Sequence, residues 1–283
     1  MKVAIVTGAG SGIGRSAAIQ IARRGTGVIL TYGKNAEGER ETAAVLENEG
    51  GTAVALPLDV GDSTALTAFR DTVTDVLRTT WQRDTFDHLV NNAGFARTSM
   101  FENTTEAEFG TLMHVLLKGP YFLTQRLLPL MADGGAIVNT SSSSAVATTG
   151  LEPGYAAYAS MKGALIVLTR YMAKEFSARG IRVNAISPGS TRTRIADDAF
   201  TRFPEVVHLR TTHPEAVAEA DGAGAGPEGR TGATAGPVDA SSSCCTVVSS
   251  IPGPGATELS DSKTQVPTMR ASPAQTAMAR PTR

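Results

Sequence analysis

The sequence has few of the features that mark secreted, membrane-bound or nucleic-acid-binding proteins. Its two cysteines, Cys244 and Cys245, are adjacent, so they cannot cross-link distant segments as a disulfide scaffold requires. No apolar run approaches the ~20 residues that a membrane-spanning helix needs, and the N-terminus lacks the regions of a signal peptide. With 26 basic and 27 acidic residues, charge gives no reason to expect a nucleic acid or an anionic membrane as partner. We therefore expect a cytoplasmic protein.

Aromatic residues are absent from the last part of the chain, and aliphatic ones are rare there. No Phe, Trp or Tyr follows Phe203, and only seven of the 70 residues in 214–283 are Ile, Leu, Val or Phe. So little apolar surface cannot offset a backbone ordering entropy of about 1–2 kcal/mol per residue. We expect a folded domain over 1–200, a transition segment over 201–213 and a low-complexity, disordered tail over 214–283.

The first two hundred residues alternate between short β-branched runs and amphipathic segments. The expected strands are 2–7, 27–32, 53–58, 86–91, 136–140 and 181–186. The expected helices are 12–24, 36–49, one from a cap at Asp62 or Ser63 to about 80, 105–131 with an interruption near Pro120, and 155–179. This alternation predicts an α/β fold with a doubly wound, Rossmann-like parallel sheet in three layers. Because such sheets bind ligands at the carboxyl ends of their strands, the residues after each strand are the candidates for a site.

A glycine-rich turn follows the first expected strand. Gly8, Gly12 and Gly14 have the spacing G-x3-G-x-G and lead into the first helix. Glycines permit a tight turn and close approach to a pyrophosphate, and the helix N-terminus supplies N–H donors. An ordinary turn is the simpler interpretation, but the strand–turn–helix context favours a dinucleotide site.

Three more motifs follow later strands in order. They are Asn91-Asn92-Ala93-Gly94, Tyr158-Ala159-Ser160-Met161-Lys162 and Pro188-Gly189. Together with the glycine-rich turn, they resemble the classical short-chain dehydrogenase/reductase family over about residues 1–195, in the manner of a 3-oxoacyl-acyl-carrier-protein reductase. The resemblance implies reversible hydride transfer between NAD(P) and a small-molecule alcohol or ketone, without a metal.

Tyr158 and Lys162 lie one helical turn apart and so share a helix face. A nearby positive charge favours tyrosinate, so we expect Lys162 to lower the pKa of Tyr158 from its ordinary value of ~10. The resemblance implies that Tyr158 is the acid and base of the reaction and that Lys162 also holds the nicotinamide ribose. Taken alone, Tyr158 would be equally consistent with a packed aromatic at the start of a helix.

A serine after the fifth strand would polarise the substrate oxygen as a fixed donor. Four consecutive serines, Ser141 to Ser144, offer candidates. Alignment from the strand selects Ser142, whereas counting back from Tyr158 favours Ser144, because the intervening loop is longer than is usual in the family. We predict Ser142 and keep Ser144 as the alternative.

The end of the second strand distinguishes NAD from NADP, because an acidic residue there would bind the 2′-hydroxyl and repel a 2′-phosphate. The run Thr31-Tyr32-Gly33-Lys34-Asn35 contains no acid and one lysine, so NADP is favoured over NAD, unless Lys34 is a solvated loop residue. The resemblance implies these further cofactor contacts: Gly8, Ser11, Gly12, Ile13, Gly14, Asp59, Val60, Asn91, Ala93, Gly94, Tyr158, Lys162, Pro188, Gly189 and Thr193.

One residue departs from this pattern, and one spacing fits an alternative. Leu116 stands where the family typically has an Asn that helps hold a water linking the lysine to solvent, so we expect a lowered rate. Tyr155 and Lys162 show the Tyr-x6-Lys spacing of enoyl reductases, an alternative that the glycine-rich turn and Asn91-Asn92-Ala93-Gly94 argue against.

The family's closing segments are not recognisable after about Ile195. We therefore expect the sheet to lack its usual last strand, with 201–213 as part of a lid at most. A reading frame shifted near residue 214 and a divergent natural ending would each produce this tail. A homo-oligomer is expected from the family, but the missing strand would remove its usual interface. The alternative function is a catalytically weak or inactive nucleotide-binding protein with an incomplete C-terminus.

Overall fold

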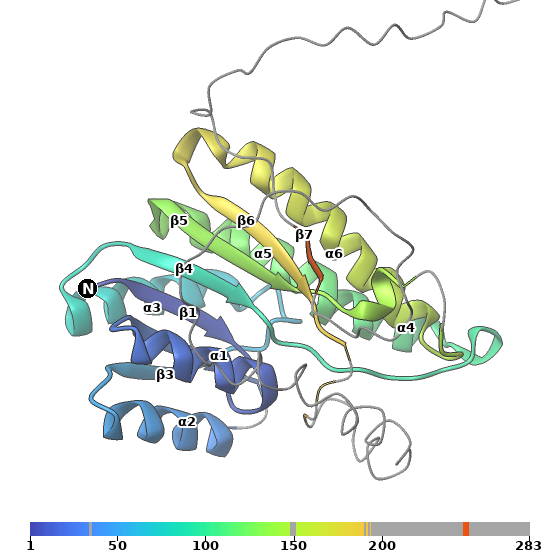
Figure 1. Ribbon diagram of the computed structural model, residues 1–283, viewed down its shortest axis with the longest axis horizontal. Helices are drawn as coiled ribbons and strands as arrows, with labels where there is room; N and C mark the ends of the chain where they lie inside the picture. Colours follow the sequence, from blue (N-terminus) through green and yellow to red (C-terminus); the bar gives the residue numbers. More distant parts are fainter. Residues whose placement is uncertain (34–35, 148–150, 190, 192, 194–245, 249–283) are drawn as a thin grey trace, which may run out of the picture.

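The computed structural model describes residues 1–33, 36–147, 151–189, 191, 193 and 246–248. Seven strands form one sheet in the order β3-β2-β1-β4-β5-β6-β7 (Figure 1). They are β1 (Val3–Thr7), β2 (Gly27–Tyr32), β3 (Ala53–Pro57), β4 (Phe86–Asn91), β5 (Met131–Thr140), β6 (Arg182–Ser187) and β7 (Thr246–Val248). β1 to β6 pair in parallel, and the chain winds outward from β1 in both directions, which confirms the predicted doubly wound fold.

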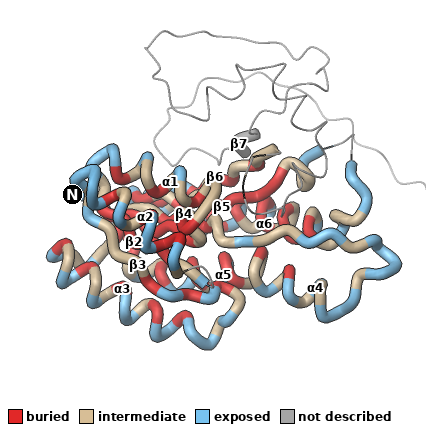
Figure 2. Tube along the Cα trace, turned by 90° about the horizontal axis from the view of Figure 1, so that it is seen from below, coloured by how far each residue is buried: buried red, intermediate tan, exposed pale blue. Residues whose placement is uncertain are grey.

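Helices cover both faces of the sheet. They are α1 (Gly12–Arg23), α2 (Ala36–Asn48), α3 (Leu66–Trp81), α4 (Glu106–Met113), α5 (Gly119–Leu127) and α6 (Ala156–Glu175). One apolar cluster joins α1 and α2 to the sheet, and a larger one joins α3, α5 and α6 to it. Burial is accordingly concentrated in the strands and on the inward sides of the helices (Figure 2). None of the described helices is both long and apolar enough to cross a membrane.

The helix predicted over 105–131 is interrupted by a π-helical turn, which lies before Pro120. α4 and α5 are joined by a π-helical turn over His114–Lys118, and Pro120 lies in the first turn of α5. Proline fits at that position because the first N–H groups of a helix have no intrahelical partner. The interruption therefore precedes Pro120, and residues 128–130 form a 3-10 turn that leads into β5.

The start of α3 also differs from the prediction. The Asp62 carboxylate accepts hydrogen bonds from the N–H and hydroxyl of Thr64, at 2.9 and 2.6 Å, and so closes a local turn. α3 then begins at Leu66, without a side-chain cap from its N-cap residue Ala65. Short polar side chains commonly form such local turns in competition with helix capping.

A short strand occupies the edge of the sheet beyond β6, within the tail that we expected to be disordered. Thr246–Val248 forms the short strand β7, antiparallel to β6, with Ala185 opposite Val248 and Ser187 opposite Thr246. Thr-Val-Val has high β propensity, and the edge of β6 offers unpaired N–H and C=O groups. The predicted lid segment 201–213, the remaining tail and Lys34 lie outside the described residues.

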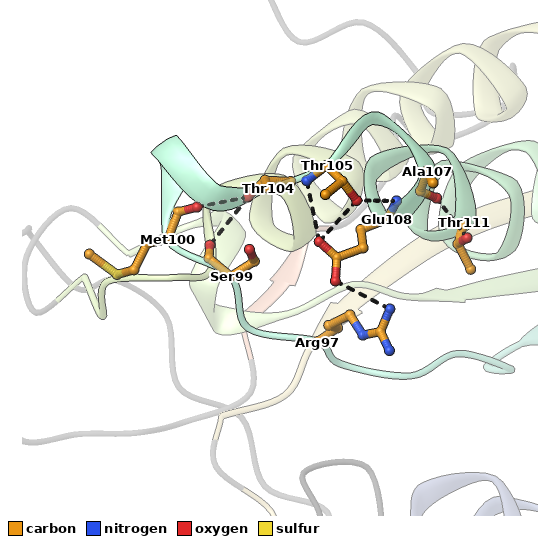
Figure 3. A network of polar contacts seen from close by, with 8 residues as sticks. All are labelled: Arg97, Ser99, Met100, Thr104, Thr105, Ala107, Glu108 and Thr111. Carbon is orange, nitrogen blue, oxygen red and sulfur yellow. Dashed lines mark hydrogen bonds and ion pairs between the residues drawn. The ribbon is translucent and has the colours of Figure 1, made fainter.

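A polar network fixes the segment before α4 (Figure 3). Thr105 and Glu108 form a capping box, in which each side chain accepts a hydrogen bond from the other residue's backbone N–H. Arg97 pairs with Glu108 at 3.4 Å. The N–H of Ser99 donates to the carbonyl of Gly154 at 2.9 Å. These contacts hold the segment beside the loop that enters α6.

Candidate active site

The glycine-rich turn after β1 depends on Gly8, Gly12 and Gly14 for its shape. Gly8 and Gly12 have φ angles of +64° and +56°, in the left-handed region that other residues rarely adopt. A Cβ at Gly14 would lie 2.3 Å from the Gly8 carbonyl oxygen and 2.4 Å from Nδ2 of Asn92. Ser11 is the N-cap of α1, but its side chain makes no capping hydrogen bond. The first N–H groups of α1 are therefore left for an anion, as a pyrophosphate site requires.

Thr7 ties this turn to the end of β4. Its hydroxyl donates to the carbonyl of Val90 at 3.2 Å and accepts from the N–H groups of Asn92 and Ala93, both at 2.9 Å. The side-chain amide of Asn92 donates to the carbonyls of Thr7 and Gly8. The motif after β4 thus clamps the glycine-rich turn from the neighbouring strand.

Tyr158 and Lys162 lie on the inner face of α6, and both are buried. The Lys162 ammonium donates to the carbonyl oxygen of Thr140, the last residue of β5, at 2.7 Å, and lies 5.8 Å from the centroid of the Tyr158 ring. The two side chains therefore meet at the carboxyl end of the sheet, as their spacing predicted.

The serine run after β5 bends toward the same place. The N–H of Ser141 donates to the carbonyl of Ile186, and that of Ser143 donates to the carbonyl of Pro188. A side-chain hydrogen bond joins Ser142 to Tyr158. Ser144 does not contact the tyrosine in any described hydrogen bond, but its N–H and hydroxyl each lie 3.2 Å from the Ser142 oxygen. The structure therefore brings Ser142 to the tyrosine and places Ser144 behind it.

The pKa of Tyr158 differs from the expected direction. Burial raises it above the ordinary tyrosine value, the hydrogen bond to Ser142 lowers it, and Tyr155 raises it further. Burial also lowers the pKa of the Lys162 ammonium to about 8. The predicted net lowering of the Tyr158 pKa is thus wrong for this structure, because the rise caused by burial exceeds the effects that favour tyrosinate.

Leu116 lies in the π-helical turn and is 1% exposed. It packs in a cluster with Tyr158, Met161 and Leu112. It also contacts the end of β4, since a Cβ at Gly94 would lie 2.9 Å from the Leu116 Cδ2 and 3.8 Å from the Lys162 nitrogen. An apolar side chain therefore fills the space beside the ammonium, which hydrogen-bonds to the backbone instead.

Comparison with known proteins agrees with this geometry. The sequence matches the family described as Enoyl-(Acyl carrier protein) reductase over residues 8–221. A Thermotoga maritima protein named "Uncharacterized oxidoreductase" is 37% identical over 194 residues, which are 68% of this chain and 72% of that protein. The 3-oxoacyl-[acyl-carrier-protein] reductase FabG of Staphylococcus aureus is 35% identical over 190 residues, 66% of this chain and 74% of FabG. The crystal structure of a short chain dehydrogenase from Burkholderia cenocepacia in complex with NADP has 32% sequence identity and a TM-score of 0.65, covering 74% of this chain and 81% of that one. The chain belongs to the short-chain dehydrogenase/reductase family.

This short-chain dehydrogenase/reductase belongs to a family of oxidoreductases that use NAD(P), and its described residues fit a dinucleotide. Gly12 lies against Thr193, because a Cβ at Gly12 would come within 2.9 Å of the Thr193 Cγ2. This contact brings the segment after β6 onto the glycine-rich turn. The described part of the chain contains no cluster of three or more metal-ligating side chains.

The structure describes the surroundings of three further predicted cofactor contacts, Asn91, Asp59 and Val60. The Asn91 side chain is buried between β4 and β5, where it donates to Thr124 and Asn139, so its amide faces the core. Asp59 follows β3 and accepts from the N–H of Gly61 at 2.9 Å. Val60, beside it, is buried. Asn91 can therefore meet a ligand only through its backbone.

Sequence reasoning missed several groups at this edge of the sheet. The Thr140 carbonyl could not be foreseen as the partner of Lys162, because any backbone carbonyl can serve. The roles of Thr7 and Asn92 depend on the register of β1 with β4. Glu39 of α2 is fully buried against the glycine-rich turn, although the sequence places it among the exposed acids of an amphipathic helix.

Proposed function

We propose that this chain is an NAD(P)-dependent oxidoreductase that interconverts a ketone and a secondary alcohol, with Tyr158 as the acid and base. The observation that carries the proposal is the buried group formed by Ser142, Tyr158 and Lys162. A hydrogen bond joins the serine to the tyrosine, and the lysine ammonium lies behind the ring. All three stand at the carboxyl edge of the sheet, beside the glycine-rich turn.

The glycine-rich turn and the start of α1 would hold the pyrophosphate of the cofactor. Ser11, Ile13 and Gly14 would present N–H groups to it, and Thr193 would contact the nicotinamide end. When bound, the nicotinamide supplies or accepts the hydride of the reaction. The absence of an acid at the end of β2 and the presence of Lys34 favour NADP over NAD.

The proton needed by a ketone reduction would come from the Tyr158 hydroxyl. Its raised pKa keeps the group protonated near neutral pH, so it is a donor ready to meet a developing alkoxide. Ser142 would donate a second hydrogen bond to the substrate oxygen and stabilise the negative charge that develops there. The positive charge of Lys162 would stabilise the tyrosinate that remains.

Tyr155 is a weaker candidate for the same role. It is the N-cap residue of α6, and its ring packs edge-on against Tyr158 with centroids 6.0 Å apart. The serine hydrogen bond goes to Tyr158, and Lys162 follows Tyr158 by one helical turn. These contacts support Tyr158 as the acid and base and leave Tyr155 as part of the wall around it.

Leu116 favours a second candidate, a dinucleotide-binding protein with weak or no turnover. The side chain is buried next to the Lys162 ammonium and cannot form a hydrogen bond. Reprotonation of Tyr158 through Lys162 and solvent would then be slow. The glycine-rich turn is unaffected by this residue, so binding would persist where catalysis is poor.

One experiment separates the two candidates. The full chain is titrated with NADPH and with NADH, following cofactor fluorescence, and is then assayed on cyclic, aryl and β-keto-ester ketones. Saturable binding with turnover on at least one ketone supports the oxidoreductase. Saturable binding with no turnover on any of them supports the second candidate. Failure to bind either dinucleotide overturns both.

A further inference from the structure

Glu39 is the one acidic residue in the described part of the chain that is buried, with 1% of its surface exposed. It lies in the first turn of α2, and the following turn of the same helix carries the buried residue Thr42. Burial of a carboxyl group is costly unless the group is hydrogen-bonded or neutral. This position therefore calls for a physical explanation.

The glycine-rich turn supplies the contacts of Glu39. The backbone N–H groups of Ala9 and Gly10 donate to its carboxyl group, while Oε2 is buried without a hydrogen-bond partner. The Thr42 hydroxyl also lies against the turn, 3.1 Å from the carbonyl oxygen of Ala9, while its shorter hydrogen bond of 2.7 Å is to the carbonyl of Gly38 in the same helix. The Glu39 carboxyl group thus takes up two N–H groups of the glycine-rich turn. Other N–H groups of the same turn are suited to bind an anion.

This contact lies where the adenosine half of a dinucleotide is recognised. The N–H of Gly8 donates to the carbonyl of Thr31 at 3.0 Å, which joins the turn to the end of β2. In doubly wound sheets the end of the second strand recognises the 2′ position of the adenosine ribose. α2 follows β2 after a short connection. Glu39, in the first turn of α2, therefore lies near the end of β2, although it is not part of that strand.

No cation neutralises Glu39 within the described structure. Burial raises its pKa to about 7, against the lowering effect of the two N–H donors. The elements packed against α2 are α1, β2 and β3. No charged side chain of these elements is among the causes of the raised pKa of Glu39. On α2 itself, Glu37 and Arg40 pair with each other at the surface, and Glu41 is exposed.

We propose that Glu39 is a specificity-determining residue, whose carboxylate opposes the 2′-phosphate of NADP(H) at the corner between the glycine-rich turn and β2. The inference rests on the proposed dinucleotide-binding function. The sequence after Thr31 contains Lys34 and no acidic residue, which favours NADP, and Glu39 limits that preference. NADH and NADPH carry the same pyrophosphate, but NADH has a neutral 2′-hydroxyl, so the charge of Glu39 should weaken NADPH binding more than NADH binding.

Two consequences follow for binding. Replacement by glutamine keeps the size and an acceptor oxygen but removes the charge, so E39Q should raise the affinity for NADPH relative to NADH by roughly three- to ten-fold at pH 8. Between pH 8 and 6 the 2′-phosphate of NADPH itself also gains protons, which changes the ratio in every variant. Because the Glu39 carboxyl group becomes protonated as well, the ratio at pH 6 divided by that at pH 8 should be larger in the unaltered chain than in E39Q.

The test measures dissociation constants of NADPH and NADH by fluorescence titration at pH 6 and 8, for the unaltered chain, E39Q and E41Q. E41Q removes the same charge from an exposed position of the same helix, and its ratio should match that of the unaltered protein. Thermal unfolding checks that E39Q is folded, and E39Q is the reference for the pH dependence of the unaltered chain. An E39Q ratio at pH 8 equal to that of the unaltered chain, or an equal rise in E41Q, would overturn the proposal. So would an identical change of the ratio with pH in E39Q and in the unaltered chain. Absence of binding to both dinucleotides in the unaltered chain would instead overturn the proposed function.

Discussion

The Lys162 ammonium donates a 2.7 Å hydrogen bond to the carbonyl oxygen of Thr140 and so joins α6 to the end of β5. This bond holds the positive charge 5.8 Å from the centroid of the Tyr158 ring. It also supplies the only hydrogen-bond partner that the described residues give the ammonium. The electrostatic effect of Lys162 on Tyr158 is therefore weaker here than their spacing suggested, and burial dominates both pKa values.

The ionisation of Lys162 predicts a pH dependence of ketone reduction. Its pKa is about 8, so the ammonium is charged below that pH and loses its charge above it. Because the charge stabilises the tyrosinate left after proton donation, kcat/KM should be level below pH 8 and fall above it. Initial rates between pH 6 and 9.5 test this. K162R keeps a charge throughout the range, so a fall of equal size in its residual activity would contradict the assignment.

Replacement of Gly14 by alanine should cause a steric clash that the same replacement at Gly110 does not cause. In G14A the new Cβ would meet the Gly8 carbonyl and the Asn92 amide, so the turn must open. We expect a loss of at least about 2 kcal/mol of stability and no measurable dinucleotide binding. Gly110 of α4 has no atom within 4 Å of its Cβ position, and G110A should gain up to about 1 kcal/mol. Urea unfolding and NADPH titration measure both. Equal effects of the two substitutions would contradict the packing described for the turn.

Replacement of Ser142 and of Ser144 by alanine should reduce turnover to different extents. S142A removes the hydrogen bond to Tyr158 and a donor to the substrate, so kcat should fall by about 10²–10³-fold. S144A removes only a contact behind Ser142, and we expect a loss of about ten-fold or less. Steady-state rates with one ketone decide between them. A larger loss in S144A than in S142A would reverse the assignment.

Replacement of Leu116 by asparagine should raise the rate and lower the stability. An amide there lies near the ammonium and can bind water, so L116N should raise kcat several-fold, while the loss of apolar burial costs about 2–4 kcal/mol. Leu112, in the same cluster and 2% exposed, provides the control. L112N should lose stability without any gain in rate. An L116N variant that folds but turns over no faster would remove this explanation for a slow enzyme.

The sequence was sufficient to predict the elements that local pattern determines. The apolar run Val3–Thr7 and the alternation of strand-like and helical segments predicted six parallel strands, and these occur in the predicted order along the chain. The motifs placed Ser142, Tyr158 and Gly14 at one edge, because carboxyl ends of parallel strands share an edge. Family resemblance supplied the roles.

The remaining features depend on tertiary contacts. The π-helical turn at His114–Lys118 and the pairing of β7 with β6 depend on neighbours distant in sequence. The raised pKa of Tyr158 depends on its burial, which spacing along a helix does not reveal. Glu39 is the clearest case, because nothing in an acidic amphipathic segment distinguishes the one carboxyl group that faces the turn.

The most direct test of the central claim compares Y158F with the unaltered chain in two measurements, NADPH affinity and turnover of the best ketone. Y158F should bind NADPH with an affinity within about two-fold and lose turnover by at least about 10³-fold, because phenylalanine retains the packing of the ring and lacks the hydroxyl that donates the proton. Turnover in Y158F equal to that of the unaltered chain would contradict the assignment of Tyr158 as the acid and base.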